Sequence, residues 1–405
     1  MQEIRNDFPI FQNNPDLVFL DSTSSTQKPK YVIDGICNYL SNSYSNIHRG
    51  LYDIAIESEE IYFESKKKVA NFLGTQDFKE IVYTYNSNYA LNIISQTLRL
   101  NQVLQAGDKV LVSIVEHHSN IVPWLILKEE IGIELEYVNI NENFEIDFID
   151  FEKKYDEKVK VIAFTHVSNV TGQIFDLEKI GKIKRKDTLF IVDASQSFPH
   201  FQVNVEKLNC DFLFFTAHKI MADSGLGVIW GKRELLENYK PIFSGGGAIN
   251  EVKTQSFKNG ALPYKFEPGT PNISGALSLL KALEYIENIG GYEKIDAIEN
   301  DLVQYSLEQF SKRPHLKLLG SKTAQNRVGV FGFYIEGVHS LDIADIMAEH
   351  NICIRAGQHC TEPFMDYLGI GSSARMSLYI YNSRTDIDSF FEVLDNNFNK
   401  EGQTK

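Results

Sequence analysis

The sequence predicts an α/β protein in which helices cover a mostly parallel sheet. Short apolar runs alternate along the chain with longer amphipathic ones, the pattern of strands joined by covering helices. Helical periodicity is clearest in residues 59–73, 89–100 and 274–289. The expected strands are residues 80–85, 109–115, 159–165, 189–193, 212–216 and 227–230.

A second pattern follows the glycine pair Gly290-Gly291, which marks an expected boundary. We therefore expect a large unit over residues 21–289 and a small α+β unit over residues 290–405, with residues 1–20 packing on the small unit. The polar tail, residues 401–405, is expected to be frayed. Within the small unit we expect helices at 293–310, 340–350 and 385–398 and strands at 327–335, 352–355 and 373–377.

Composition excludes several classes of partner. The chain has 405 residues and a net charge of −14, which argues against nucleic acid because phosphate binding needs a basic face. No apolar stretch reaches the length of a membrane span, and residues 1–7 lack the pattern of a signal peptide. The four cysteines follow no disulfide framework. We therefore expect a cytoplasmic protein with free thiols, with neither nucleic acid nor membrane as a partner.

Polar residues stand where two neighbouring predicted strands end. Asp193 closes one strand, and the sequence Thr216-Ala-His218-Lys219 closes the next. A pyridoxal phosphate enzyme needs a lysine that forms the Schiff base and a carboxylate that pairs with the pyridinium nitrogen. Burial of Lys219 would lower its pKa and favour the nucleophilic free amine. A structural ion pair for Lys219 and a helix cap for Asp193 are the alternatives.

Candidate groups for the cofactor surround these strand ends. Thr216 and His218 supply donors suited to a phosphate. Ser87 and Asn88 open a predicted helix, where backbone N–H groups bind anions, although such a polar cluster is also a good N-cap. Gln196 would donate to the 3-hydroxyl of the cofactor ring, or else share the cap of Asp193.

The histidine pair His117-His118 follows another predicted strand. Paired histidines suggest a metal, but adjacent residues at a strand end point in opposite directions and rarely chelate one ion. The sequence also has no HExxH or CxxC spacing. We therefore expect no metal, and one imidazole stacked on a flat cofactor ring and able to carry protons.

Cys360 lies in a polar loop with glycine and proline, so we expect it to be more exposed than Cys353, which alternates within an apolar strand. A nearby His359 or Arg355 would favour its thiolate. The alternative is an incidental surface cysteine. Arg375 on the next strand could hold a substrate carboxylate in a bidentate pair, or could form a structural ion pair instead.

Ordered motifs over nearly the whole length carry a family resemblance. They are Phe19-Leu-Asp21-Ser22, Ile47-His48-Arg49-Gly50, Glu116-His-His-Ser-Asn120, Thr165-His-Val-Ser-Asn169, Phe266-Glu-Pro-Gly-Thr270, Arg355-Ala-Gly-Gln-His-Cys360 and Arg375-Met-Ser-Leu-Tyr379. The chain resembles the class V aminotransferase superfamily of fold-type I pyridoxal phosphate enzymes, and within it the Suf-type (group II) cysteine desulfurases. The short loop around Cys360 is the group II feature. The resemblance implies a mostly parallel seven-stranded sheet in the large domain.

The resemblance also implies roles for the matching positions. Lys219 would bind pyridoxal phosphate and shuttle the Cα proton, and His117 would stack on the ring and act in acid–base steps. Cys360 would attack the substrate sulfur, leaving an enzyme persulfide and releasing alanine. Asp193 and Gln196 would tune the ring, and Ser87, Asn88, Thr216, His218 and, from a second subunit, Thr270 would hold the phosphate. Asn169 and Arg375 would bind the substrate carboxylate, with His48, Arg49 and Arg355 lining the pocket.

The function that the resemblance implies is that of a homodimeric enzyme acting on L-cysteine. It would pass sulfur to an acceptor protein of the Suf system for iron–sulfur cluster assembly. Selenocysteine lyase, another class V activity such as an epimerase or aminotransferase, and a non-catalytic scaffold remain open as alternatives. An activity that needs Lys219 but not Cys360 would favour another class V enzyme.

Several departures from the family pattern surround the phosphate. The family usually has Gly-Thr-Thr where this chain has Asn86-Ser87-Asn88, and a Gly-Pro-x-Gly turn where it has Ala222-Asp223-Ser224-Gly225. Asn88 replaces a hydroxyl donor, and Asp223 brings negative charge towards a dianionic phosphate. We therefore predict weaker cofactor retention than is usual for the family.

Overall fold

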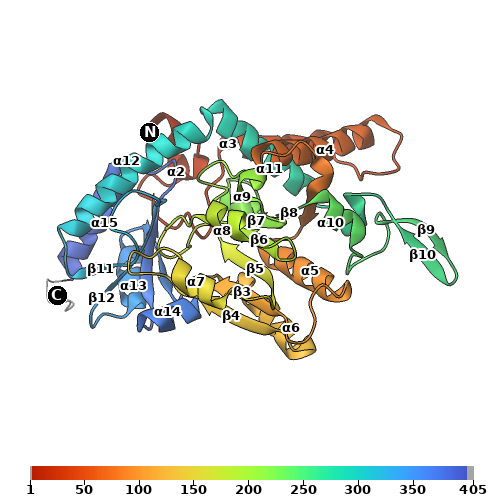
Figure 1. Cartoon of the computed structure of the whole chain (residues 1–405). Helices are drawn as coiled ribbons and strands as arrows, with labels where there is room; N and C mark the ends of the chain where they lie inside the picture. Colours follow the sequence, from red (N-terminus) through yellow and green to blue (C-terminus); the bar gives the residue numbers. More distant parts are fainter. Residues whose placement is uncertain (1, 399–405) are drawn as a thin grey trace.

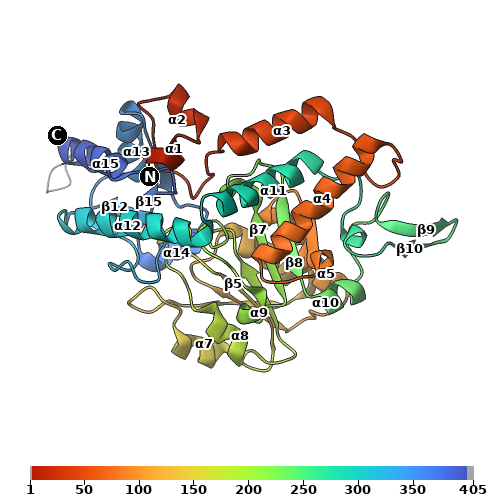
Figure 2. The same ribbon diagram turned by 90° about the horizontal axis from the view of Figure 1, so that it is seen from above.

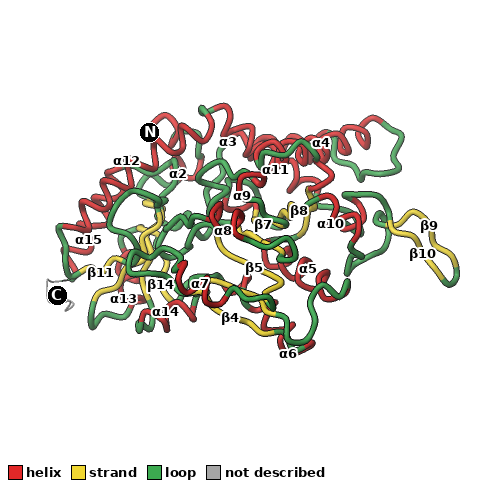
Figure 3. The backbone as a smooth tube through the Cα atoms, in the orientation of Figure 1, coloured by secondary structure: helices red, strands yellow, loops and turns green. Residues whose placement is uncertain are grey.

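The computed structural model describes residues 2–398, and the two largest of its sheets have seven and four strands (Figure 1). A seven-stranded sheet lies at the centre, with helices on both of its faces, and a four-stranded sheet lies beside it (Figure 3). The first and last described helices, α1 (Gln2–Arg5) and α15 (Arg384–Asn397), both lie on the side of the smaller sheet (Figure 2). The tail expected to be frayed, residues 401–405, lies outside the described residues.

The large sheet confirms the predicted α/β class. Its strand order is β2-β8-β7-β6-β5-β3-β4, and every pair is parallel except the two that β8 makes with β2 and β7. The strands are β2 (Ile81–Thr84), β3 (Lys109–Ser113), β4 (Glu134–Val138), β5 (Val159–Thr165), β6 (Leu189–Asp193), β7 (Phe212–Thr216) and β8 (Gly227–Gly231). In β5, Ala163 packs into one core and Phe164 into the other, so both faces are buried and the strand is apolar throughout.

Helices cover the two faces of this sheet. On one face, α5 (Ser87–Leu100) and α6 (Val122–Ile131) pack on the strands. On the other, α4 (Asp53–Phe72) and α3 (Lys30–Asn42) flank α11 (Ile273–Asn288), and the three lie side by side above β7 and β8 (Figure 2). The shorter helices are α7 (Phe148–Lys154), α8 (Leu177–Ile183), α9 (Val205–Leu208) and α10 (Arg233–Asn238).

The smaller sheet is antiparallel with the order β11-β12-β15-β14. Its strands are β11 (Leu316–Leu318), β12 (Val330–Ile335), β14 (Arg355–Gly357) and β15 (Ser373–Ser377), and its helices are α12 (Gly291–Ser311), α13 (Ser340–Glu349), α14 (Glu362–Leu368) and α15 (Arg384–Asn397). The strand predicted at 352–355 is two strands, because β13 (Ile352–Cys353) pairs with β1 (Val18–Phe19) whereas β14 pairs with β15.

The N-terminal segment contains α1 (Gln2–Arg5), α2 (Pro9–Asn13) and β1. Arg5 forms an ion pair with Asp386 of α15 at 3.0 Å. The ring of Phe8 lies 4.9 Å from that of Tyr381 and 6.0 Å from that of Tyr285 in α11, centroid to centroid. This segment therefore contacts both the region of the smaller sheet and the helices of the large one.

Sequence periodicity missed several elements, and for some of them the reason is limited burial. The hairpin of β9 (Ile249–Lys253) and β10 (Ser256–Asn259) projects from the body and has no buried face (Figure 1). Edge strand β4 has one fully buried residue, Val138, and helix α3 has two, Val32 and Tyr39. In the part of the chain that the structure describes, no helix combines the length and apolar character needed to cross a bilayer.

Candidate functional site

Strand register brings Lys219 and Asp193 to the same edge of the large sheet. Asp193 is the last residue of β6 and pairs with Phe214 in β7, and β7 leads into the 3-10 helix Ala217–Lys219. Burial lowers the pKa of Lys219 to about 8, although the Asp193 carboxylate opposes this shift. At a pKa of about 8, a much larger fraction of Lys219 is the neutral, nucleophilic amine near physiological pH than for an ordinary lysine.

Asp193 is buried, and its Oδ1 accepts a hydrogen bond from the backbone N–H of Ser195 at 2.8 Å. Burial raises the pKa of its carboxyl, whereas the charge of Lys219 acts in the opposite direction. The side-chain nitrogen of Gln196 donates to the carbonyl of Thr23 at 2.9 Å. Residues 195–200 form turns, so neither side chain caps a helix here.

His117 is held as a neutral imidazole. Its Nδ1 accepts from the backbone N–H of Ser119 at 3.1 Å, which leaves the ring proton on Nε2. Burial lowers the pKa of His117 to about 3, and Lys219 and His118 add to this effect. The two histidine rings lie 6.2 Å apart, and His118 pairs instead with Glu362. The two histidines of the pair therefore contact different partners.

The predicted phosphate residues lie around Gly227 of β8, which pairs with Thr84 on one side and Thr216 on the other. A Cβ at Gly227 would lie 2.5 Å from the backbone of Asn86, so only glycine lets the start of α5 approach this closely. This brings Ser87 and Asn88, in the first turn of α5, to the strand end that carries Thr216 and His218. Asn86 caps the helix by accepting from the N–H of Tyr89 at 3.0 Å, so the N-cap reading holds as well.

Two of these groups have properties that suit a bound anion. The buried Oγ1 of Thr216 has no hydrogen-bond partner among residues 2–398. Burial lowers the pKa of His218 to about 4, so its half-buried ring is neutral. Thr270 is exposed, in the loop that precedes α11.

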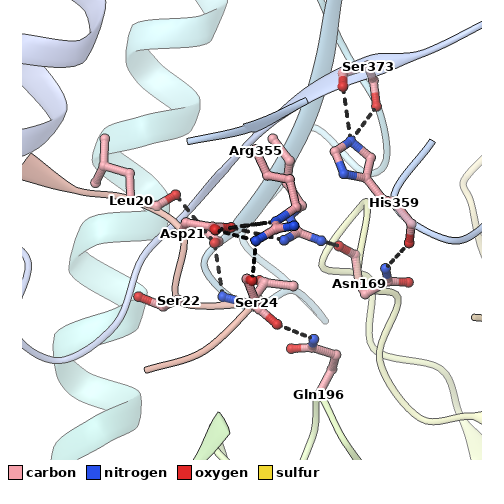
Figure 4. A network of polar contacts seen from close by, with 12 residues as sticks. Leu20, Asp21, Ser22, Ser24, Asn169, Gln196, Arg355, His359 and Ser373 are labelled. Carbon is pink, nitrogen blue, oxygen red and sulfur yellow. Dashed lines mark hydrogen bonds and ion pairs between the residues drawn. The ribbon is translucent and has the colours of Figure 1, made fainter. Parts of the chain in front are cut away.

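Arg375 of β15 is only 3% exposed and bonds to two residues of the polar network in Figure 4, Asp21 and Asn169. It donates through one NH₂ group to the carbonyl of Asn169 at 3.0 Å and through the other to Asp21 at 3.1 Å. Its buried Nε has no partner in the described chain. Burial lowers the pKa of Arg375 to about 10, and Asp21 opposes this shift. Arg355 also pairs with Asp21, at 3.0 Å.

The exposed Cys360 lies in the loop between β14 and α14, beyond the half-buried Cys353. His359 and Cys360 both adopt left-handed backbone conformations, with φ of 55° and 56°. The side chain of Asn169 donates to the carbonyl of His359 at 3.0 Å, and the backbone N–H of His118 donates to that of Cys360 at 2.8 Å. Residues outside the Cys360 loop, Asn169 and His118, therefore hold its backbone in place.

His359 does not supply the positive charge that its position suggested. Its Nε2 lies 3.0 Å from both oxygens of Ser373 (Figure 4). Burial lowers the pKa of His359 to about 3, so the ring is neutral near pH 7. Of the two candidates for stabilising the thiolate, only Arg355 carries charge.

Two predicted pocket residues lie apart from the others. The ring of His48 packs against that of Tyr264, with 4.9 Å between the ring centroids, and Arg49 is exposed. No hydrogen bond or ion pair within residues 2–398 joins either residue to Lys219 or Cys360. The buried Nε2 of His48 has no partner there.

Two further carboxylates belong to the site and were given no role from the sequence. Asp21 bridges both arginines, and Glu116, directly before His117 in the chain, is fully buried. Glu116 accepts from the N–H of Thr165 at 2.8 Å and from Asn120 at 2.7 Å, and burial raises its pKa to about 8. Asp21 and Glu116 each directly follow an apolar run in the sequence, and this pattern could have identified both as candidates.

Comparisons with known proteins agree with this geometry. The family profile described as Aminotransferase class-V matches residues 18–390. The chain is 35% identical over 396 residues to the "Probable cysteine desulfurase" of Synechocystis sp., covering 96% of this chain and 94% of that protein. It is 35% identical over 396 residues to the one of Pyrococcus abyssi, covering 97% and 96%.

Two solved structures are similar in fold as well as sequence. The apo cysteine desulfurase from Thermococcus onnurineus NA1 has a TM-score of 0.92 and 35% identity, covering 97% of this chain and 96% of that one. The cysteine desulfurase CsdA from Escherichia coli, in its S-sulfonic acid form, has a TM-score of 0.89 and 30% identity, covering 97% of each chain.

Proposed function

Because the chain belongs to the class-V aminotransferase family, we propose that it is a pyridoxal phosphate-dependent cysteine desulfurase, which converts L-cysteine to L-alanine. One observation carries the proposal: Lys219, Cys360 and Arg375 come from distant parts of the chain and lie close together. Arg375 and Cys360 lie close enough to Lys219 for their charges to act on its pKa. Such a set can bind an amino acid carboxylate, exchange its Cα proton and attack its sulfur.

The residues around Lys219 fit the cofactor. The buried hydroxyl of Thr216 has no partner within the described chain, as expected of a group that awaits a ligand. Asp193 would pair with the ring nitrogen, and the first turn of α5 offers N–H groups to the phosphate. Bound pyridoxal phosphate supplies an electron sink for the charge that develops at the substrate Cα. We assign the phosphate to Ser87, Asn88, Thr216 and His218, and the ring to His117, Asp193 and Gln196.

We assign carboxylate binding to Arg375 and proton transfer to Lys219 and His117. Arg375 would receive the substrate carboxylate through its free Nε and its remaining N–H groups. Lys219, whose pKa burial lowers to about 8, would take and return the proton at Cα as a neutral amine. His117 would carry protons as a neutral ring through Nε2.

Cys360 would receive the sulfur. Its thiolate attacks the sulfur of the substrate, so an S–S bond forms while the Cβ–S bond breaks, and the electron pair remains on Cβ. Protonation of Cβ then gives alanine, and the enzyme keeps a persulfide. The exposed position of Cys360 supports onward transfer to a second protein.

We further propose a homodimer of the Suf type in the cytoplasm that supplies sulfur for iron–sulfur clusters through an acceptor protein. Thr270 and Arg49 are exposed, and the buried Nε2 of His48 has no partner within the described chain, so we assign these three residues to the site of a second copy. The exposed apolar residues Leu51 (93% exposed) and Tyr52, next to His48 in the chain, are of the kind that an interface covers.

The test is to incubate cofactor-loaded protein with L-cysteine and a reductant and to quantify alanine and sulfide. We expect equal amounts of both, abolished in Cys360→Ala and retained in Cys37→Ala, which removes another exposed cysteine. Retained activity in Cys360→Ala would favour another class-V reaction. A loaded enzyme that forms no alanine would point to another substrate, and a protein that never binds the cofactor would point to a scaffold.

A further inference from the structure

A buried ion pair lies along the free edge of the large sheet. β2 is the outermost strand of this sheet, next to β8. On its other side, the backbone N–H of Tyr83 donates to the carboxylate of Glu267 at 2.5 Å. Lys66 of α4 donates to the carbonyl of Ile81 at 2.9 Å and pairs with Glu267 at 2.5 Å. The pair therefore satisfies backbone groups that an edge strand would otherwise leave open.

The carboxylate of Glu267 is held at both of its oxygens. Lys66 and the N–H of Tyr83 donate to Oε1, and the hydroxyl of Tyr62 in α4 donates to Oε2 at 2.9 Å. The side chains of Lys66 and Glu267 are only 0% and 6% exposed. Charge-assisted hydrogen bonds of this kind are short and directional, so the carboxylate has a single position.

Two segments with proposed phosphate ligands extend from this carboxylate. The first is β2, which continues from Tyr83 into the turn before α5, where Ser87 and Asn88 form the first turn. The second is the loop that runs from Glu267 to Thr270 and then into α11. One buried group therefore joins the start of α5 to the Thr270 loop.

The Thr270 loop is also held at its far end. Asn272 caps α11 by accepting from the N–H of Gly275 at 2.9 Å, and α11 lies beside α4 (Figure 2). Within the loop, the N–H of Gly269 donates to the carbonyl of Gly246 at 2.7 Å. Thr270 itself is exposed, so its position depends on these anchors on either side of it.

We propose that Glu267 is a positioning residue for the phosphate of the cofactor, because it holds the first turn of α5 and the Thr270 loop in one frame. This inference rests on the proposed function, in which α5 binds the phosphate of its own site and Thr270 that of a second copy. Loss of the Glu267 carboxylate weakens both sets of phosphate contacts. The groups assigned to the ring, His117 and Asp193, follow other strands and keep their places.

The experiment compares two ligands of the full-length protein after its cofactor is removed, pyridoxal phosphate and pyridoxal. They share the ring and the aldehyde and differ by the phosphate, and titrations followed by visible absorbance give both Kd values. We expect Glu267→Gln to weaken pyridoxal phosphate relative to pyridoxal by about ten-fold, the effect of about one charge-assisted hydrogen bond. A purely structural role would weaken both ligands alike, so a wild-type ratio of the two Kd values would overturn the proposal.

Asp211 provides a matched control. Its buried carboxylate also accepts from a strand N–H, that of Phe190 at 2.8 Å, and pairs with a buried lysine, Lys184, at 3.0 Å. It directly precedes β7, whose other end carries Thr216. Asp211→Asn should therefore keep the wild-type ratio even where it lowers stability. An equal shift in Asp211→Asn and Glu267→Gln would overturn the proposal.

A milder variant covers the case in which Glu267→Gln does not fold. Tyr62→Phe removes one of the three donors to Glu267 and no charge, so the ratio should shift in the same direction by about three-fold. Tyr39→Phe is its control, because the buried hydroxyl of Tyr39 donates to Ser58 of α4 at 2.9 Å and not to Glu267. Equal ratios in the two tyrosine variants would overturn the positioning role.

Failure of the proposed function gives a different result from failure of this inference. A wild-type protein that binds neither ligand would overturn both. A wild-type protein that binds pyridoxal phosphate tightly, with the same ratio in Glu267→Gln, would overturn only the role of Glu267.

Discussion

The backbone N–H of His118 donates to the carbonyl oxygen of Cys360 at 2.8 Å, which fastens the cysteine loop to the segment that carries His117. Asn169 holds the preceding carbonyl, that of His359, at 3.0 Å. The left-handed conformations of His359 and Cys360 persist only when the surroundings impose them. The position of the proposed nucleophile is therefore set by the large sheet and not by its own loop.

We predict that Glu362→Gln loosens this loop. Glu362 pairs with the ring of His118, and both side chains are partly exposed, so the pair contributes only about 0–1 kcal/mol. Alkylation of Cys360 by iodoacetamide, followed by mass spectrometry, should become about two- to five-fold faster, and alanine formation should slow by a similar factor. Glu284→Gln, which breaks the pair with Lys281 on another surface, is the control. Equal alkylation rates in the two variants would contradict the prediction.

Local sequence predicted the elements whose burial is evident from their own residue types. Strands β5, β6 and β7 match their predicted bounds because both faces are buried, which makes each run apolar. The residues at the ends of these strands, Asp193 and Thr216–Lys219, could be recognised for the same reason.

Pairings between distant residues could not be predicted in this way. Asp21 and Arg375 are 354 residues apart and meet only because β1 joins the C-terminal region through β13. No periodicity in either segment encodes that contact. The neutral state of His359 likewise depends on burial against Ser373, which its polar loop sequence conceals.

Arg375→Lys should raise the KM for L-cysteine by about ten- to a hundred-fold with a smaller change in kcat. Lysine keeps the charge but loses the planar fork that holds a carboxylate with two hydrogen bonds. Steady-state kinetics with alanine detection measures the effect. Arg5→Lys makes the same change in another largely buried ion pair and should leave KM unaltered. A normal KM in Arg375→Lys would mean that the arginine serves only as the structural partner of Asp21.

Asn88→Thr should slow the loss of cofactor by about ten-fold. The variant restores a hydroxyl donor in the first turn of α5, and a hydrogen bond to a charged group contributes roughly 1.5–3 kcal/mol. The other departure, Asp223, should repel the phosphate less than its charge alone implies, because that charge interacts with the charge of Lys28. Visible absorbance during prolonged dialysis measures cofactor loss. Asn92→Thr, one turn further along and also exposed, should lose it at the wild-type rate, and full occupancy of the wild type after dialysis would contradict weak retention.

Glu116→Gln should change how stability depends on pH. Burial raises the pKa of Glu116 to about 8 in the folded protein, so the folded state binds this proton more tightly than the unfolded chain does. The contribution of Glu116 is therefore fully present at pH values below its ordinary pKa of 4.5 and is lost as the pH rises through about 8. Glutamine does not titrate, so the stability gap between wild type and variant should shrink from about pH 5.5 to about pH 8.5.

Urea denaturation midpoints at several pH values measure this gap, and Glu129→Gln, at an exposed position of α6, controls for the loss of one formal charge. The variant should be the less stable at low pH, because an amide nitrogen cannot accept the hydrogen bond that Asn120 donates to Glu116. A gap that stays constant over this range would mean that Glu116 is already ionised in the folded protein. In that case Glu116 would be a buried negative charge close to Asp193, and not a neutral acid.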